Sequence, residues 1–314
     1  MWNELLKAFI YDFIGLEGKL AEAGHFFVYD TVKIWFLLLT IIFAVSFLRT
    51  WVNTEYVRAH LQGKSALYGH IAAAAFGIIT PFCSCSAIPL FLGFIQARIP
   101  LGVTFSYLIS APMNNEIAIA MLFGLFGWKV TSLYIGFGLL VAILGGMFIG
   151  KLNLDKEILM DVKPLETELQ ANLVKLSFQQ RVKEAWEYTW DIFKKIYLYV
   201  LLGVGVGAWI HGYIPTDFIA QYTGAGNPFA VIIAVIMGIP MYSNAAGVMP
   251  LVEVLTAKGM LLGTALSFMM AVTALSLPEA LILKKIISLK LIAIFFGIVG
   301  SGIIAIGYLL NFIL

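Results

Sequence analysis

The sequence predicts an all-α polytopic membrane protein built from two inverted repeats, each containing a broken or re-entrant helical hairpin. Three observations support this prediction. The 314 residues are 61% hydrophobic and only 12% charged, with a mean hydropathy of +0.93, whereas a soluble domain has about 25% charged residues. Two long apolar stretches are interrupted by proline and small polar residues, and the two halves match at an offset of 161 residues. This composition excludes a disordered chain, a nucleic-acid-binding domain and a secreted disulfide scaffold.

Several apolar stretches have the length of roughly 20 residues that crosses a bilayer as a helix. They cover about 27–48, 100–124, 131–150, 192–211, 260–283 and 289–312. Two others, at about 66–97 and 228–257, are too long for one span and short for two. Non-helical backbone at membrane depth is tolerated only where protein or a wet cavity satisfies its polar groups. We therefore predict a broken or re-entrant hairpin in each of these two stretches.

Charged residues are concentrated between the two apolar halves. The segment from Lys151 to Lys195 holds 16 of the 38 formal charges, which is typical of a solvated linker with an amphipathic, interfacial part. The first residues mix charged and apolar positions and lack the uninterrupted core of a signal peptide. The predicted regions are an N-terminal interfacial segment (1–26), a first membrane repeat (27–150), a charged cytoplasmic linker (151–190) and a second membrane repeat (191–314).

Glycine, proline and lysine residues recur at the same positions of the two halves, which indicates an internal duplication. At the offset of 161, Gly77 matches Gly238, Pro89 matches Pro250, Gly102 matches Gly263, Ser106 matches Ser267, Lys129 matches Lys290, Gly136 matches Gly297 and Gly146 matches Gly307.

The distribution of positive charge favours repeats of opposite orientation. If each hairpin returns to its starting side or crosses twice, each repeat crosses an odd number of times and the second repeat is inverted. With the linker inside, seven Lys or Arg residues of the connecting segments lie inside and two outside; parallel repeats reverse this count. The seven are Arg49, Arg58, Lys64, Arg98, Lys284, Lys285 and Lys290, the two are Lys129 and Lys258, and Lys7, Lys19 and Lys33 count against the arrangement. The positive-inside rule therefore favours inverted repeats, an architecture of secondary transporters with a midplane site between the repeats.

The break in the first hairpin contains the only two cysteines of the chain, Cys83 and Cys85, within the segment Thr80–Pro89. Soft thiolates bind soft metals and metalloids, and a trivalent arsenical with one organic group has two exchangeable positions for two thiols. A disulfide between residues i and i+2 is disfavoured by its geometry. The alternative is that Cys83, Ser84, Cys85 and Ser86 are small residues that permit close helix packing.

The corresponding break of the second hairpin has no cysteine and offers the hydrogen-bonding groups of Tyr242, Ser243 and Asn244. A further polar cluster, Ser110–Glu116, lies inside the stretch 100–124 and includes Asn114 and Asn115. We expect these side chains to contribute to substrate binding, although a kink with self-satisfied polar groups is the alternative.

Two carboxylates lie at candidate membrane depth. Glu116 belongs to the polar cluster of the first half, and Glu279 pairs with it when a two-residue shift is allowed. An intramembrane carboxylate is by default a hypothesis for proton or cation coupling, whereas an interfacial ion pair of Glu279 with Lys284 or Lys285 is the structural alternative. The four histidines are scattered without metal-site spacing, and the chain lacks a nucleotide-binding loop, so no cofactor is predicted.

From about residue 27 to the C-terminus, the sequence resembles the predicted permease family of the organoarsenical exporter (ArsP-like) and YraQ-like type. The residues that carry the resemblance are Pro81–Ser86, Ser110–Glu116 and the Ser243-Asn244 break. The resemblance implies a multi-pass permease of the bacterial inner membrane, some members of which export trivalent organoarsenicals through cysteine thiols.

The sequence therefore predicts a secondary transporter, not an enzyme, for a small thiol-reactive or sulfur-containing solute, most concretely the efflux of trivalent organoarsenicals. Its predicted partners are the lipid bilayer, a small-molecule substrate and the proton as coupling ion, with no nucleic acid. Two alternatives remain open, a membrane thiol oxidoreductase using Cys83 and Cys85 and an ion channel. The missing second cysteine pair and the lack of a C-x-x-C spacing count against the oxidoreductase.

Overall fold

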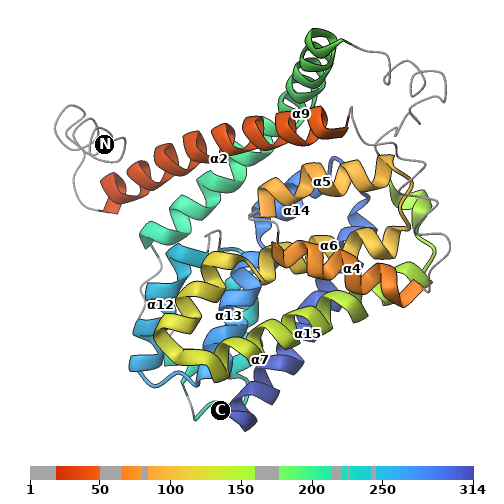
Figure 1. Cartoon of the computed structure of the whole chain (residues 1–314). Helices are drawn as coiled ribbons and strands as arrows, with labels where there is room; N and C mark the ends of the chain where they lie inside the picture. The colour runs from red at the N-terminus through yellow and green to blue at the C-terminus, as the bar shows by residue number, and fades with distance from the viewer. Residues whose placement is uncertain are drawn as a thin grey trace. The chain divides into compact units, whose positions relative to one another are not determined.

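The computed structural model describes residues 19–49, 66–79, 84–159, 177–213, 221–224, 226–241 and 245–314. These residues are almost entirely helical (Figure 1). The helices are α2 (Lys19–Arg49), α4 (Ala66–Ile79), α5 (Ser84–Gln96), α6 (Leu101–Met113), α7 (Glu116–Lys151), the 3-10 turn η2 (Asp155–Glu157), α9 (Phe178–Tyr213), α11 (Ala230–Gly238), α12 (Ala245–Ala257), α13 (Leu262–Ala274), α14 (Leu277–Leu283) and α15 (Leu289–Ile313).

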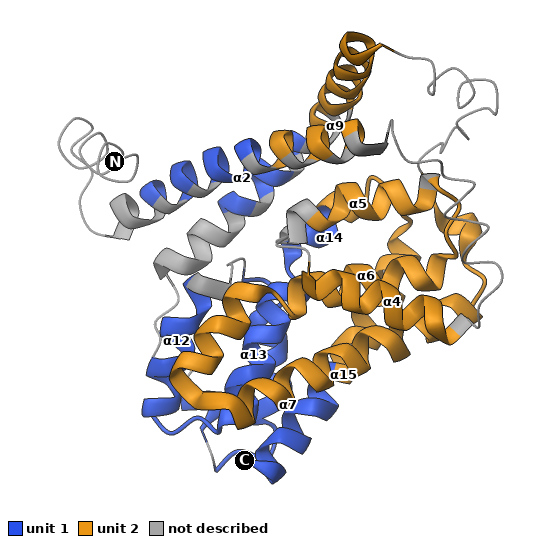
Figure 2. Ribbon diagram, viewed as in Figure 1, with its two compact units in different colours: residues 1–36, 197–281, 303–314 blue, residues 37–196, 282–302 orange. Residues whose placement is uncertain are grey.

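The chain divides into two compact units, shown in Figure 2. Unit 1 comprises residues 1–36, 197–281 and 303–314, and unit 2 comprises residues 37–196 and 282–302. Helices α2, α9, α14 and α15 contribute residues to both units.

Four of the described segments are long and apolar enough to cross a membrane, which confirms the predicted class of all-α, multi-pass membrane protein. They are Phe27–Ala44, Glu116–Lys151, Leu262–Leu283 and Leu289–Ile313. The predicted span over 192–211 is not among them; it forms part of α9, which begins at Phe178 within the predicted linker. The predicted span over 100–124 is not one helix, because α6 ends at Met113 and α7 begins at Glu116.

Helix α6 forms the centre of unit 2, since all of its residues from Leu101 to Met113 are buried. Apolar residues around its whole circumference explain this position. At about 1.5 Å per residue its 13 residues extend only about 20 Å, less than the roughly 30 Å of a bilayer core. The helix therefore ends in the protein interior rather than at a membrane surface.

Helix α7 continues the chain after this interior break. Asn115 caps it, because the Asn115 Oδ1 accepts a hydrogen bond of 2.9 Å from the Ile117 N–H. Glu116 in the first turn and Lys151 in the last complement the helix dipole. A sharp kink falls at Gly127, whose φ of 74° and ψ of −179° are available essentially only to glycine.

The helix bounds repeat at the offset that the sequence predicts. Helices α5 and α12 differ by 161 residues at both ends, and so do α6 and α13. The start of α7 corresponds to the start of α14, and the kink at Gly127 corresponds to Ser288, just before α15. The structural elements therefore follow the duplication without insertion or deletion from residue 84 to the last helix.

The same close packing occurs in both copies, each inside its own unit. In unit 2, a Cβ added at Gly102 of α6 would lie 2.6 Å from the Gly146 carbonyl oxygen of α7. In unit 1, a Cβ added at Gly263 of α13 would lie 2.6 Å from the Gly307 carbonyl oxygen of α15. Ser106 and Ser267 cover the partner glycine in each case. Only glycine permits this approach of two helix backbones.

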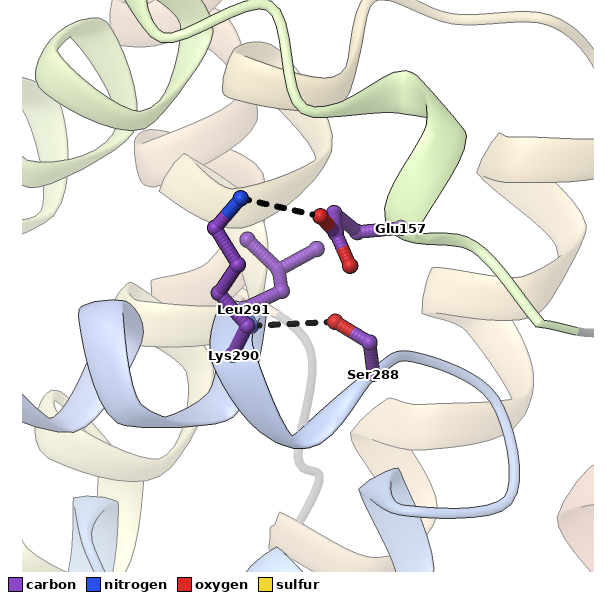
Figure 3. Close-up of polar contacts among 4 residues, drawn as sticks. All are labelled: Glu157, Ser288, Lys290 and Leu291. Carbon is purple, nitrogen blue, oxygen red and sulfur yellow. Dashed lines mark hydrogen bonds and ion pairs between the residues drawn. The ribbon is translucent and has the colours of Figure 1, made fainter.

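The start of the linker is fixed to the start of α15 within unit 2 (Figure 3). Glu157 forms an ion pair of 3.2 Å with Lys290 and accepts a backbone hydrogen bond of 2.8 Å from Ser288. The Ser288 Oγ in turn caps α15 by accepting from the Leu291 N–H at 3.2 Å. An antiparallel bridge between Ile158 and Ile287 extends the contact. The end of α7 and the beginning of α15 therefore lie on the same side of unit 2.

Helices α7 and α15 run antiparallel in unit 2. Ile298 lies against Gly145, and Val141 lies against Gly302, so that residue numbers rise along one helix while they fall along the other. Val141 and Gly302 are themselves equivalent positions, 161 residues apart. Direct contact between equivalent residues of antiparallel elements is typical of packing about a two-fold axis.

Candidate functional site

Helix α4 packs along α6 toward the break between α6 and α7. Along the two helices His70 Nδ1 lies 2.8 Å from Ser106 Oγ, Ser110 Oγ donates a 2.7 Å hydrogen bond to the Ala74 carbonyl, and Gly77 packs on Ala111. These pairs show that α4 and α6 run parallel and end together, as Figure 1 also shows. Helix α4 therefore ends beside the end of α6.

The break after α6 contains a buried amide with an unsatisfied oxygen. Asn114 is fully buried, its N–H donates to the Ser110 carbonyl at 2.9 Å, and its Nδ2 lies 3.3 Å from the Ser110 Oγ. The Asn114 Oδ1 has no hydrogen-bond partner among the described residues. It faces Gly138 of α7, where a Cβ would clash with the amide. A buried polar atom without a partner is costly, so this oxygen is a candidate for a functional role.

The remaining polar groups of the first break have structural partners. The Tyr134 hydroxyl donates a 2.7 Å hydrogen bond to the Met113 carbonyl, which the end of α6 leaves without a helical partner. Asn115 is half-buried, and its Oδ1 serves as the cap of α7. Tyr134 was not among the residues predicted from the sequence, although a tyrosine inside an apolar span is a signal, because its hydroxyl requires a partner when buried.

The second repeat has its break between α13 and α14, in unit 1. The Leu277 N–H donates a 2.9 Å hydrogen bond to the Ile239 carbonyl, so the second hairpin also reaches the break of the helix that follows it. Ser276, between the two helices, is buried, and its Oγ has no hydrogen-bond partner among the described residues. Glu279 in the first turn of α14 is fully buried as well, and neither of its carboxylate oxygens has such a partner there.

The two predicted coupling carboxylates lie in different environments. Glu116 is exposed, whereas Glu279 has an exposed fraction of 0%. The helix bounds explain the difference, because at the offset of 161 Glu279 corresponds to the buried Ala118 and Glu116 to Leu277. The two-residue shift that paired the two glutamates in the sequence is therefore absent from the structure.

The other predicted binding residues have the following places. Ser84, Cys85 and Ser86 form the first turn of α5. Cys83, Tyr242, Ser243 and Asn244 lie outside the described residues. The structure thus describes both helix breaks and the helices that flank the hairpin tips.

Helices that end in the protein interior, beside buried polar groups without partners among the described residues, are typical of multi-pass membrane transporters. The chain belongs to a family described as predicted permeases, whose family model matches residues 19–312. This confirms the resemblance from which the sequence analysis drew its functional prediction.

Relatives with similar sequences occur in archaea and bacteria. A UPF0718 protein of Methanocaldococcus jannaschii is 22% identical, with 84% of this chain and 87% of the relative covered. The UPF0718 protein YraQ of Escherichia coli is 21% identical over 80% of this chain and 70% of its own length. YcgR of Bacillus subtilis is 21% identical over 58% of this chain and 60% of its own length. No solved structure matches the chain.

Proposed function

We propose that this permease is a secondary transporter of the bacterial inner membrane for a small thiol-reactive or sulfur-containing solute, most concretely a trivalent organoarsenical that it exports. The observation that supports this most lies in unit 2, where α4, the helix that precedes the cysteine-bearing segment in the chain, packs along α6 as far as the break at which the Asn114 Oδ1 is buried and has no partner among the described residues. Cys83 and Cys85 follow α4 directly in the sequence.

The chemistry of the two groups is complementary. Two thiolates replace the two exchangeable groups of a trivalent arsenical that carries one organic substituent. An amide oxygen accepts a hydrogen bond from a hydroxyl group of such a solute before exchange. Ser84, Ser86, Asn115, Tyr242, Ser243 and Asn244 complete the proposed binding set.

We infer further that the two repeats have opposite orientations. The Glu157–Lys290 ion pair supports this inference, because it keeps the start of α15 on the side where α7 ends. The segment of α7 that is equivalent to α15 runs from the kink at Gly127 to Lys151. It therefore begins at the end that is remote from the Glu157 contact. The antiparallel contact of Val141 with Gly302 supports the same arrangement, and inverted repeats with paired broken helices fit alternating access around one site.

Thiol dependence tests the proposed function. In an arsenic-sensitive bacterial host, the wild-type protein is expected to confer resistance to methylarsenite, and Cys83→Ser and Cys85→Ser are each expected to abolish it. Serine keeps the small volume, so the variants should reach the membrane in normal amounts. Pentavalent methylarsenate is the matched control solute, because it does not bind thiols in this oxidation state. Wild-type resistance in either variant would contradict the thiol site and favour packing as the role of these cysteines.

A further inference from the structure

Glu279 stands out as a titratable group buried in the protein without a partner. Its exposed fraction is 0%, and neither carboxylate oxygen has a hydrogen-bond partner among the described residues. An ionised carboxylate in such surroundings has lost its hydration and gained no compensating donor or positive charge, at a large cost in free energy. In this conformation the neutral, protonated carboxyl is therefore the stable form.

Among the described residues of unit 1, the helices that pack on α13 offer Glu279 no positive charge. Helices α11 and α13 contain no titratable residue, and α12, which packs on α13, has only the exposed Glu253. The two lysines that follow α14, Lys284 and Lys285, are exposed. The interfacial ion pair considered as an alternative for Glu279 is thus not formed.

Glu279 lies close in the chain to a contact between α14 and the second hairpin. Glu279 lies in the first turn of α14, three residues after Ser276. Ser276 itself lies in the interruption between α13 and α14. The Ser276 hydroxyl is also buried and has no partner within the described part of the chain. The Leu277–Ile239 hydrogen bond ties this interruption to the second hairpin. A rearrangement of the hairpin would therefore change the surroundings of Ser276 and Glu279 directly.

We propose that Glu279, with Ser276 beside it in the chain, is the site that takes up and releases the coupling proton of the transporter. The carboxylate gains one proton from water on one side of the membrane to become a carboxylic acid, and it returns that proton to water on the other side after the site has reopened. No covalent step or further reactant is required. This inference rests on the proposed transport function and adds the coupling ion and its site to it.

The asymmetry between the repeats supports this assignment. The position equivalent to Glu279 in the first repeat is Ala118, which is also buried but has no titratable group. Conversely, the positions equivalent to Cys83 and Cys85 are Asn244 and Ala246. One repeat thus supplies the thiols and the other the proton site, which divides solute binding and coupling between two copies of the same scaffold.

Transport in proteoliposomes tests the proposal with methylarsenite as the probe. At equal pH on both sides, wild type and Glu279→Gln are both expected to exchange methylarsenite, because glutamine resembles the protonated side chain. With a pH difference of one unit, wild type is expected to accumulate the solute up to about tenfold for one proton per solute, in one orientation of the gradient. Glu279→Gln should show no accumulation in either orientation, and the exposed control Glu253→Gln should accumulate it as wild type does. Wild-type accumulation by Glu279→Gln would overturn the proposal.

A measurement without solute separates this proposal from the proposed function. Infrared difference spectra of the purified protein between two pH values report the carbonyl band of a protonated carboxylic acid. We expect a band that Glu279→Gln removes and Glu253→Gln leaves in place; if Glu279→Gln does not reach the membrane, Glu279→Asp should shift it. An unchanged spectrum in the Glu279 variant excludes the proton site. If wild type does not move methylarsenite but the Glu279 band is present, the proposed substrate fails while the proton site stands.

Discussion

Gly146 of α7 faces the backbone of α6 with no room for a side chain. A Cβ at this position would lie 2.6 Å from the Gly102 carbonyl oxygen and 2.9 Å from the Ser106 nitrogen, both of which are backbone atoms that cannot move alone. Gly146→Ala is therefore expected to lower the free energy of unfolding by about 1–3 kcal/mol, the usual cost of overpacking. Thermal unfolding of the purified protein in detergent measures the change.

The control for this prediction lies on the same helix. A Cβ at Gly136 would have no neighbour within 4 Å, so Gly136→Ala is expected to raise stability by up to about 1 kcal/mol through helix propensity. Equal effects of the two substitutions would show that the close contact of α6 with α7 does not govern stability.

At the residue scale, the sequence predicted the polar residues of the breaks better than their environments. Asn114 and Asn115 were both assigned to substrate binding, yet the structure uses Asn115 as a helix cap and leaves only the Asn114 Oδ1 without a partner. The burial of Glu279 was not predictable, because the nearby Lys284 and Lys285 indicated an interfacial ion pair. Which side of a seven-residue helix faces the protein is decided by packing, not by local sequence.

The kink inside α7 makes a prediction at the scale of the element. Gly127 has a φ of 74° and a ψ of −179°, a conformation that costs a residue with a Cβ about 1–3 kcal/mol. Gly127→Ala is expected to lower the melting temperature, whereas Gly124→Ala, at an ordinary helical position with no neighbour within 4 Å, should leave it unchanged or raise it. A Gly127→Ala protein as stable as Gly124→Ala would mean that α7 tolerates straightening.

The contact between the linker and α15 makes a second prediction at this scale, on pH. A hydrogen bond from the Ser288 side chain and the neighbouring Lys290 ammonium lower the pKa of Glu157 from its usual value of 4.5. Because the folded-state pKa is the lower one, the stabilising contribution is complete above pH 4.5 and is lost as the pH falls through the folded value. The melting temperature of wild type should exceed that of Glu157→Gln near pH 7, and the difference should vanish well below pH 4.5. A difference that is independent of pH would exclude the charge of Glu157 as its source.

The elements themselves were predictable where a composition signal marks their ends. Pro112, Asn114 and Asn115 disfavour a continuous helix, and the break between α6 and α7 falls there. The kink at Gly127 was not predicted, because a glycine in an apolar span is equally compatible with close helix packing. Helix α9 continues through residue 191, where the linker was predicted to end. The fall in charge density at that point does not coincide with the end of a helix.

At the scale of the whole molecule, the duplication explains why one scaffold carries two different chemistries. The repeated glycine contacts of Gly102 with Gly146 and of Gly263 with Gly307 conserve the packing of each copy. The two repeats differ at their breaks, where Ala118 of the first corresponds to Glu279 of the second. The proposed thiol site in the first repeat and the proposed proton site in the second are the outcome of that divergence.

The proposed opposite orientation of the repeats leads to a prediction about membrane sidedness. Lys129 and Lys290 are equivalent, exposed residues near the beginnings of equivalent helical segments, and Lys156 belongs to the linker. Because Glu157 pairs with Lys290, the linker and residue 290 must share a side, and inverted repeats place residue 129 on the other.

In a background carrying Cys83→Ser and Cys85→Ser, single cysteines at these three positions are labelled with a membrane-impermeant maleimide in intact cells and in inside-out vesicles. The 156 and 290 variants should react in inside-out vesicles, and so should variants at Asn53 and His60. The 129 variant and variants of the 213–227 loop should react in intact cells. Replacing Lys290 removes only one exposed ion pair, and such pairs contribute little to stability, so the helix should keep its place. Reaction of the 129 and 290 variants from the same side would establish parallel repeats and would leave the antiparallel contact of Val141 with Gly302 without a symmetric origin.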